Sequence, residues 1–209
     1  PAYDSAERKS FFRSTAVNRS IILESYEVEI MLRNVKPTAA GSDGLPAWLF
    51  SSCSYELATP LAHILNSSFA SGRLPSHWLC SVVTPVPKVP KPSSYSDYRP
   101  ISVTPILSRI AEKIVVSRWL RPAIPPDMIS DQYAFRPTGS TTAALVDFTH
   151  HATSMLDDNN YVRCLMIDFS KAFDTVNHTI LLTKLSALTI PDFAINWICS
   201  FLTDRSQFC

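Results

Sequence analysis

Prolines are the feature of this sequence that most restricts its fold. Six of them fall between Pro85 and Pro105, in the stretch PVPKVPKPSSYSDYRPISVTP. Because proline lacks an amide hydrogen and clashes with the preceding helical turn, no helix can run through this stretch. The β-branched residues of 81–86 favour a strand, and since proline is tolerated mainly at sheet edges, we expect an edge strand there. The rest of the stretch is expected to be an extended loop.

Helical patterns occupy most of the chain on either side of the prolines. Gly72 is expected to end a helix over 55–71 as a left-handed cap. Thr104 is expected to cap the start of a helix over 104–121, with Pro105 at its first position, and Pro122 to end that helix. The apolar periodicity predicts helices over residues 19–35, 55–71, 104–121, 140–156, 179–188 and 191–203. Ser140 is the expected cap of the fourth. Many helices separated by few strands indicate an α+β fold.

Length and composition limit the class of protein. The 209 residues are 46% hydrophobic and 18% charged, which is typical of a globular chain rather than a disordered one. The net charge of +1 excludes a strongly basic nucleic-acid-binding tail but leaves room for a local basic groove. Five cysteines without a CxxC pair indicate reduced thiols in an intracellular protein. We expect no membrane span and no signal peptide, and both ends suggest an internal piece of a longer protein.

A short apolar run ends on an acid in VRCLMIDFSKAFDTVNH. It predicts a buried strand over 161–168 that finishes at Asp168. A carboxylate at the end of a strand suits Mg²⁺, which takes oxygen ligands from few carboxylates and from phosphates. Phe173 would then lie in the turn beyond, beside a bound sugar. In the structural alternative, Asp168 caps the turn and Phe173 lies in the core. For Asp174, a role as helix cap is favoured over metal binding.

Lys88 and Arg99 are two of the three cations in the proline-rich stretch. A hairpin between Lys88 and Arg99 would bring them together, and such a pair can bind a triphosphate. A solvated loop is the simpler alternative. The segment PVPKVPKP also fits the pattern PxxP. A further alternative is therefore that a partner protein binds this segment as a proline-rich peptide.

Four blocks, in order along the chain, resemble the reverse transcriptases of non-LTR (LINE-type) retrotransposons. They are AGSDGLPAWLF, LPSHWLCSVVTPVPKVPKPSSYSDYRPISVTPILSRIAEKIV, DQYAFRPTGSTTAAL and LMIDFSKAFDTVNHTILLTKL, and FLTDRSQ is similar to the approach to a further block. The resemblance covers residues 19–209. Four ordered blocks are far more specific than one short motif.

The resemblance implies a nucleotide-binding role for five residues. Lys88 and Arg99 would hold the triphosphate of the incoming dNTP, and the backbone amides near Lys171 and Ala172 would also face its phosphates. Phe173 matches the aromatic steric gate that collides with a ribose 2′-OH and so selects deoxynucleotides.

The resemblance also implies a metal site and a template contact. Asp168 matches the first metal-binding aspartate, with the backbone carbonyl of Phe169 as a further ligand. The expected cofactor is Mg²⁺, as two ions in the complete enzyme, with Mn²⁺ as a substitute. Gln132 and Arg136, in QYAFRP, would contact template or primer.

The implied fold is the right-hand polymerase fold with fingers and an incomplete palm, and without a thumb. Residues 1–36 would be an N-terminal extension, 37–160 the fingers-like region and 161–209 the beginning of the palm. Departures from the family pattern are mild: Ser42 and Ala134 replace a usual proline or glycine, and Thr138-Gly139 replaces a glycine-basic pair. No YxDD block, which supplies two more aspartates, follows Asp168.

The predicted function is therefore a fragment of an RNA-directed DNA polymerase. The complete enzyme would extend a primer 3′-OH with dNTPs on an RNA template, and the fragment alone is expected to be inactive. Its partners would be RNA template, DNA primer and dNTPs, in a cytoplasmic ribonucleoprotein that enters the nucleus. The alternative is a non-catalytic nucleic-acid-binding remnant of a degenerate retroelement.

Overall fold

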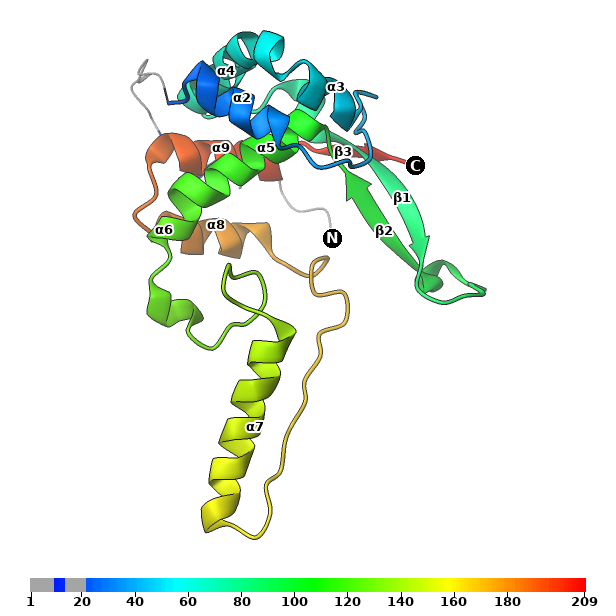
Figure 1. Ribbon diagram of the computed structural model, residues 1–209, viewed down its shortest axis with the longest axis vertical. Coiled ribbons are helices and arrows are strands. Elements are labelled where there is room, and N and C mark those ends of the chain that lie inside the picture. Colours follow the sequence, from blue (N-terminus) through cyan, green and yellow to red (C-terminus); the bar gives the residue numbers. More distant parts are fainter. Residues whose placement is uncertain (1–9, 14–21) are drawn as a thin grey trace. The chain divides into compact units, whose positions relative to one another are not determined.

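Two compact units make up the structure, a computed structural model that describes residues 10–13 and 22–209 (Figure 1). The first unit contains the chain up to Ala123 together with Asn177–Cys209, and the second contains Ile124–Val176. The predicted α+β class is confirmed, because the described residues combine many helices with one three-stranded sheet.

From residue 22 onward, the described part of the first unit contains three successive helices: α2 (Ser25–Arg33), α3 (Ala47–Ser52) and α4 (Ser54–Ser71). Helix α2 starts later than the predicted residue 19, and residues 14–21 lie outside the described part of the chain. Its start is fixed by the Glu27 carboxylate, which accepts a hydrogen bond from the Glu24 amide at 2.9 Å. The end of α4 at Gly72 is confirmed, since Gly72 has the left-handed conformation with φ of 60°.

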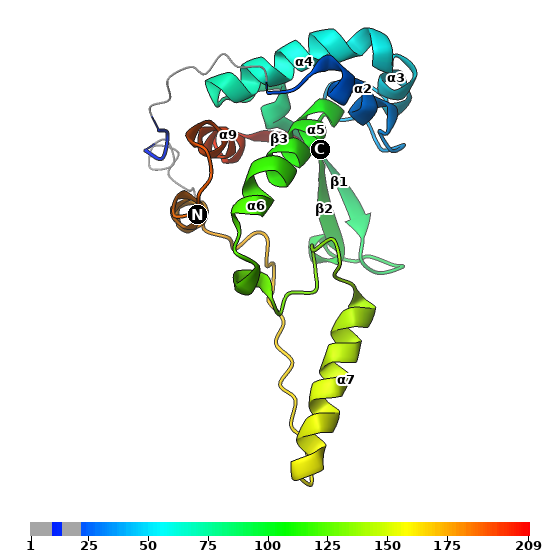
Figure 2. The ribbon, with the colours of Figure 1, turned by 60° about the vertical axis from the view of Figure 1, so that its left-hand side comes forward.

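The sheet has the order β2-β1-β3, and the hairpin β1–β2 projects from the helices of the first unit in both views (Figures 1 and 2). The segments of this region are η1 (Ser76–Leu79), β1 (Cys80–Pro87), η2 (Tyr95–Asp97), β2 (Tyr98–Val103) and β3 (Ser206–Phe208). Strand β1 pairs antiparallel with β2 and parallel with β3.

Two predictions about the proline-rich stretch are wrong. Strand β1 is the central strand rather than an edge strand, and residues 98–103 form β2 rather than loop. The physical reason is that β3 pairs only with the first residues of β1, Cys80 to Val82. Pro85 and Pro87 lie beyond that pairing, where one side of β1 is open and a missing amide breaks no ladder.

The chain continues from β2 into a long helical segment. It consists of α5 (Ile106–Val115), a π-helical turn η3 (Val116–Leu120) and α6 (Arg121–Ala123). The N-cap is Pro105 rather than Thr104. The prediction that Pro122 ends the segment is confirmed to within one residue, because the segment stops at Ala123. The π-helical turn η3 lies directly before this proline, whose ring and missing amide do not fit a regular α-helix.

Helices α8 (His178–Ser186) and α9 (Asp192–Leu202) complete the first unit. The predicted capping role of Asp174 is wrong. Asn177 caps α8 instead, because its side-chain oxygen accepts from the Ile180 amide at 3.1 Å.

Aromatic side chains form the centre of the first unit. Phe69, on α4, is fully buried, and its ring centroid lies 5.2 Å from that of Trp119 and 6.0 Å from that of Trp197. Trp197 also donates a buried hydrogen bond of 3.0 Å to Ser68 Oγ. Burial of each such side chain contributes about 1.5–3 kcal/mol, so these contacts hold α4, η3 and α9 together.

The second unit contains η4 (Pro126–Ile129) and the 18-residue helix α7 (Thr141–Asp158). The predicted cap is confirmed, because Ser140 Oγ accepts from the Ala143 amide at 3.0 Å. None of the residues of α7 is buried. Beyond α7 the chain runs back beside the helix as an extended segment without strand pairing (Figures 1 and 2).

The five cysteines all have free thiols. Within the described ranges, no helix combines the length and the apolar character needed to cross a lipid bilayer.

Candidate functional site

The predicted hairpin between Lys88 and Arg99 is present in the first unit. Val86 of β1 lies opposite Arg99 of β2, and the Lys88 amide donates to the Asp97 carbonyl at 2.7 Å. Side chains alternate along a strand, so Lys88, two residues after Val86, lies on the same face as Arg99. In a regular ladder such diagonal neighbours are about 7–8 Å apart. The register therefore places Lys88, just beyond the end of β1, close to the part of β2 that carries Arg99, and the meeting of their two charges stays a prediction.

Asp97 organises the tip of this hairpin. Its carboxylate accepts hydrogen bonds from the amides of Ser93 at 2.8 Å and Ser94 at 2.9 Å. These backbone donors hold the pKa of the Asp97 carboxyl below its ordinary value. Asp97 was not among the residues predicted from the sequence, although SYSD, with a serine three residues before the acid, has the pattern of a capping box.

The two cations are accessible. Both Lys88 and Arg99 are exposed, and neither forms an ion pair with a described residue. The Lys88 ammonium donates to the Ser96 carbonyl at 2.7 Å, which leaves its charge uncompensated. The only carboxylate between them, Asp97, is occupied by backbone amides. This face of the hairpin can therefore attract a multiply charged anion.

The hairpin also bears on the proline-rich interaction alternative. That alternative required PVPKVPKP to be a free peptide. Pro85 and Pro87 are instead paired in the ladder with Pro100 and Tyr98. Only its first residues, Pro85 to Pro87, are therefore held in the sheet. Residues 88–92 lie outside the strands at the tip of the hairpin, and residues 85–91 are exposed, as this alternative expects.

The predicted strand over 161–168 is wrong. These residues are extended but form no ladder, and the side chains of Leu165, Met166 and Ile167 are 85%, 77% and 72% exposed. The reason is that no described segment pairs with this one, and a strand requires a partner for its amides and carbonyls.

Asp168 lies just before a turn over residues 170–175 of the second unit, and Phe173 lies within that turn. The Asp174 amide donates to the Lys171 carbonyl at 2.9 Å, and Thr175 Oγ1 donates to the Ala172 carbonyl at 3.1 Å. Lys171 adopts a left-handed conformation with φ of 52°, which is unusual for a residue other than glycine.

The structural alternative for this turn does not hold. Phe173 is 83% exposed and so is not a core residue, and Phe169 is 75% exposed. Asp168 makes no hydrogen bond to a described residue, so it does not cap the turn. The turn thus presents a free carboxylate and two uncovered aromatic rings.

A complete magnesium centre does not fit the residues present. In the described part of the chain, no group of three or more His, Cys, Asp or Glu side chains lies close enough to hold a metal ion. Asp168 offers one carboxylate, whereas two ions need several oxygen ligands. The described residues therefore supply at most one part of a two-magnesium site.

Gln132 and Arg136 are engaged in the loop before α7. Arg136 Nη1 donates to the carbonyls of Ile129 at 2.7 Å, Ser130 at 2.9 Å and Gln132 at 3.2 Å. The Gln132 side chain donates to the Ala134 carbonyl at 2.9 Å. Both side chains stabilise the loop, and the other nitrogens of the Arg136 guanidinium are left for further contacts.

The candidate residues therefore form two groups in two units. Lys88 and Arg99 both lie on the β1–β2 hairpin of the first unit. The second unit contains the segment from Asp168 to Phe173, which leads into the turn over residues 170–175, and it also contains Gln132 and Arg136.

Comparisons with known proteins agree with the resemblance. The family model described as "Reverse transcriptase (RNA-dependent DNA polymerase)" matches residues 89–209. The chain is 28% identical, over 86% of its length, to the Retrovirus-related Pol polyprotein from type-1 retrotransposable element R2 of Popillia japonica. It is 30% identical to two Drosophila melanogaster proteins: over 69% of its length to the probable RNA-directed DNA polymerase from transposon BS, and over 70% to the RNA-directed DNA polymerase from mobile element jockey.

The matches cover only a small part of these relatives. The aligned region is 24% of the R2 protein and 16% of each of the other two. The chain is thus a fragment relative to its homologues, and the resemblance to retrotransposon proteins is confirmed.

Proposed function

The chain belongs to the reverse transcriptase family, and from this premise we propose that it forms the fingers and the beginning of the palm of a retrotransposon RNA-directed DNA polymerase. In this proposal residues 1–36 are an N-terminal extension, residues 37–160 are fingers-like and residues 161–209 begin the palm. The complete protein extends a primer 3′-OH with dNTPs on an RNA template. Its partners are therefore RNA template, DNA primer and dNTPs.

The β1–β2 hairpin is the observation that carries this proposal. Lys88 and Arg99 share one face of the hairpin, are exposed and lack an ion-pair partner among the described residues. A triphosphate concentrates several negative charges, which a lysine and an arginine together can neutralise. With its phosphates held there, the nucleotide is positioned for attack at the α-phosphate, and the charge on departing pyrophosphate is stabilised.

The turn after Asp168 supplies the sugar filter and one metal ligand. Phe173 is exposed beside this turn, so its ring is available to exclude a ribose 2′-OH. The amides of Lys171 and Ala172 face the phosphates of the nucleotide. Asp168, with the carbonyl of Phe169, offers ligand oxygens to magnesium, and the further carboxylates belong to other parts of the polymerase.

Gln132 and Arg136 have the remaining proposed role. Their loop contacts template or primer phosphate through the nitrogens of the Arg136 guanidinium other than Nη1, which three backbone carbonyls occupy.

Primer extension on an RNA template, by the full-length polypeptide that carries this chain, tests the proposal. The D168N variant should lose dNTP incorporation, and F173A should incorporate ribonucleotides more readily than the parent protein. D158N, at the exposed end of α7, is the matched control and should keep normal incorporation. Normal incorporation by D168N would overturn the proposed role. The 209-residue chain alone is expected to show no incorporation.

A second candidate function follows from the incomplete set of metal ligands in the described residues. A non-catalytic nucleic-acid-binding remnant would bind RNA in a salt-sensitive manner, and binding would survive D168N. If the chain belongs to such a remnant, the unsubstituted full-length protein would show no dNTP incorporation. If it belongs to a polymerase, the unsubstituted protein would incorporate dNTPs and D168N would not.

A further inference from the structure

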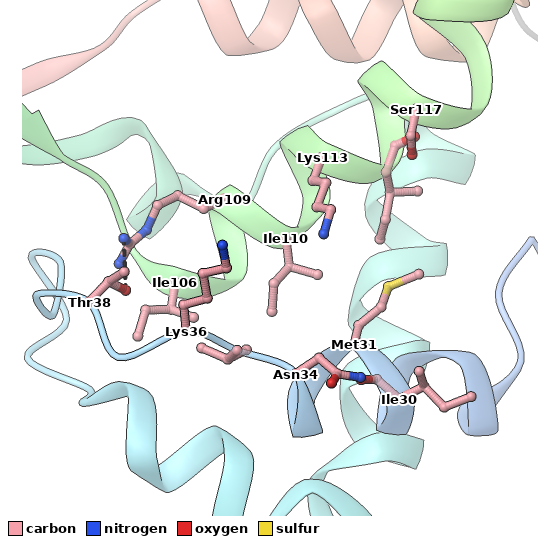
Figure 3. A pocket seen from close by; sticks show the side chains of 12 residues that line it. Ile30, Met31, Asn34, Lys36, Thr38, Ile106, Arg109, Ile110, Lys113 and Ser117 are labelled. Atoms are coloured by element: carbon pink, nitrogen blue, oxygen red, sulfur yellow. Dashed lines mark hydrogen bonds between the residues drawn. The ribbon is translucent and has the colours of Figure 1, made fainter. Parts of the chain in front are cut away.

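A groove in the first unit lies away from the hairpin and has not been assigned a role. It runs between α2 and α5 and encloses a cavity volume of about 420 Å³ (Figure 3). Its floor is aliphatic and is formed by Ile30, Met31, Ile106, Ile110 and Ile114. Ile30 is 55% exposed, so apolar surface is left open to water at the edge of the groove.

Arg109 fixes one wall of the groove. Its guanidinium donates to Thr38 Oγ1 at 3.1 Å and to the Ala39 carbonyl at 2.7 Å. These bonds tie the segment after α2 to α5. In Figure 3 the guanidinium is accordingly turned toward Thr38 rather than across the floor. Because the wall is held in this way, the groove is formed before any ligand binds.

Two lysines give the groove its charge. In the view of Figure 3, the ammonium groups of Lys36 and Lys113 lie on either side of Ile110. Both lysines are exposed, and neither forms an ion pair with a described residue. An aliphatic floor between two uncompensated cations is complementary to apolar side chains flanked by carboxylates.

We propose that this groove binds an amphipathic helix with acidic flanks from a partner protein. The groove is lined along one face of the helical segment that joins α5 and η3, from Ile106 to Ser117, at spacings of three and four residues. This face can receive the i, i+3/i+4, i+7 anchors of a helix in a groove. Met31 suits such a partner, because a methionine side chain adapts its shape.

The lining favours a protein over a single-stranded nucleic acid. Bases bind by stacking on aromatic side chains, and no Phe, Tyr or Trp lines the described groove. Isoleucines and a methionine instead offer the contacts that aliphatic anchors require. The lysines then select carboxylates at the flanks of the helix.

A labelled synthetic helix tests the proposal. The probe carries Leu at i, i+3, i+4 and i+7, with Glu at its flanks, and its binding to the 209-residue chain is measured by fluorescence anisotropy. A second peptide replaces each Glu with Lys. The chain should bind the acidic peptide, and the K36E/K113E variant should bind it at least about tenfold more weakly. The charge-reversed variant should in turn prefer the basic peptide.

The matched control is K91E/K184E, which reverses two exposed lysines outside the groove. It should bind the acidic peptide as the parent chain does. Thermal unfolding of each variant shows whether the fold is kept. The proposal is overturned if both double variants lose binding equally, if the parent chain does not bind the acidic peptide, or if single-stranded RNA binds the groove in place of the peptide.

Discussion

Asn196 holds Arg13 through both ends of its side-chain amide. Asn196 Oδ1 accepts from the Arg13 amide at 2.7 Å, and Nδ2 donates to the Arg13 carbonyl at 2.9 Å. Asn196 is 3% exposed, and the Arg13 guanidinium also donates to the Ser186 carbonyl at 3.0 Å. The short segment of residues 10–13 is thus attached to α8 and α9, across a long separation in sequence.

Removal of this amide should destabilise the first unit. N196A leaves the backbone amide and carbonyl of Arg13 without partners, which should cost about 1–3 kcal/mol in the free energy of unfolding. All four tryptophans belong to the first unit, so urea unfolding followed by tryptophan emission reports on it. N159A removes an exposed asparagine from the end of α7 and should change this transition by less than about 0.5 kcal/mol. Equal stability of N196A and the parent chain would contradict the account.

Gly72 and Gly44 form a matched pair for a second prediction. Both have positive φ, of 60° for Gly72 and 69° for Gly44. A Cβ added at Gly72 would lie 2.6 Å from Asn196 Cβ, whereas a Cβ added at Gly44 would have no described atom within 4 Å. G44A should therefore cost only the left-handed conformation, about 1 kcal/mol. G72A adds overpacking against α9 and should cost about 2–4 kcal/mol. Urea unfolding of the two variants checks the order, and a G44A variant as unstable as G72A would be inconsistent with the packing described.

Glu112 predicts a dependence of stability on pH. Its carboxylate accepts from Ser108 Oγ at 3.0 Å, and burial raises its pKa more than this bond and the nearby Arg205 and Arg109 lower it. Because the pKa of Glu112 is raised in the folded chain, its contribution to stability is greatest below the ordinary glutamate pKa of about 4.3. This contribution is lost as the pH rises through the pKa of the folded state.

The E112Q variant isolates this effect, because glutamine imitates the protonated carboxyl at every pH. The free energy of unfolding of E112Q minus that of the parent chain should be larger at about pH 7 than at about pH 4. The measurement is urea unfolding across this range. A difference between E112Q and the parent chain that stays constant across this pH range would count against burial as the cause.

The unpaired segment before Asp168 predicts self-association. Leu165 and Ile167 alternate along an extended chain and therefore share a face, and both are exposed. L165K/I167K should lower light scattering severalfold at high protein concentration, without a shift in the tryptophan unfolding transition. T149K/T153K places two lysines on exposed positions of α7 instead. If that control lowers scattering equally, net charge rather than the apolar segment explains the effect.

Local signals in the sequence predicted the parts of the fold that depend on neighbouring residues. Gly72 ends α4 and Ser140 starts α7 because each requires only the adjacent turn. The hairpin of Lys88 and Arg99 was foreseen only as one alternative beside a solvated loop, although its two strands are close in sequence. The pair could be chosen from the chain because two cations flank a segment that cannot be helical.

Two of the failures concern pairing between segments that are distant in sequence. The central position of β1 depends on β3, more than 120 residues away, and no pattern within residues 81–86 reveals it. The segment 161–168 has the composition of a strand but lacks a pairing partner among the described residues. The capping role went to Asn177 rather than Asp174, a shift of three residues that depends on where α8 begins.

Direct binding of a nucleotide tests the central claim. Titration of the 209-residue chain with a fluorescent dNTP in magnesium-containing buffer gives the dissociation constant for the parent chain, for K88Q/R99Q and for K91Q/K184Q. The account predicts that K88Q/R99Q binds at least about tenfold more weakly, which corresponds to ~1.4 kcal/mol, and that inorganic tripolyphosphate competes with the nucleotide. K91Q/K184Q should bind as the parent chain does. Equal weakening in the two double variants, or binding that tripolyphosphate does not displace, would contradict the account.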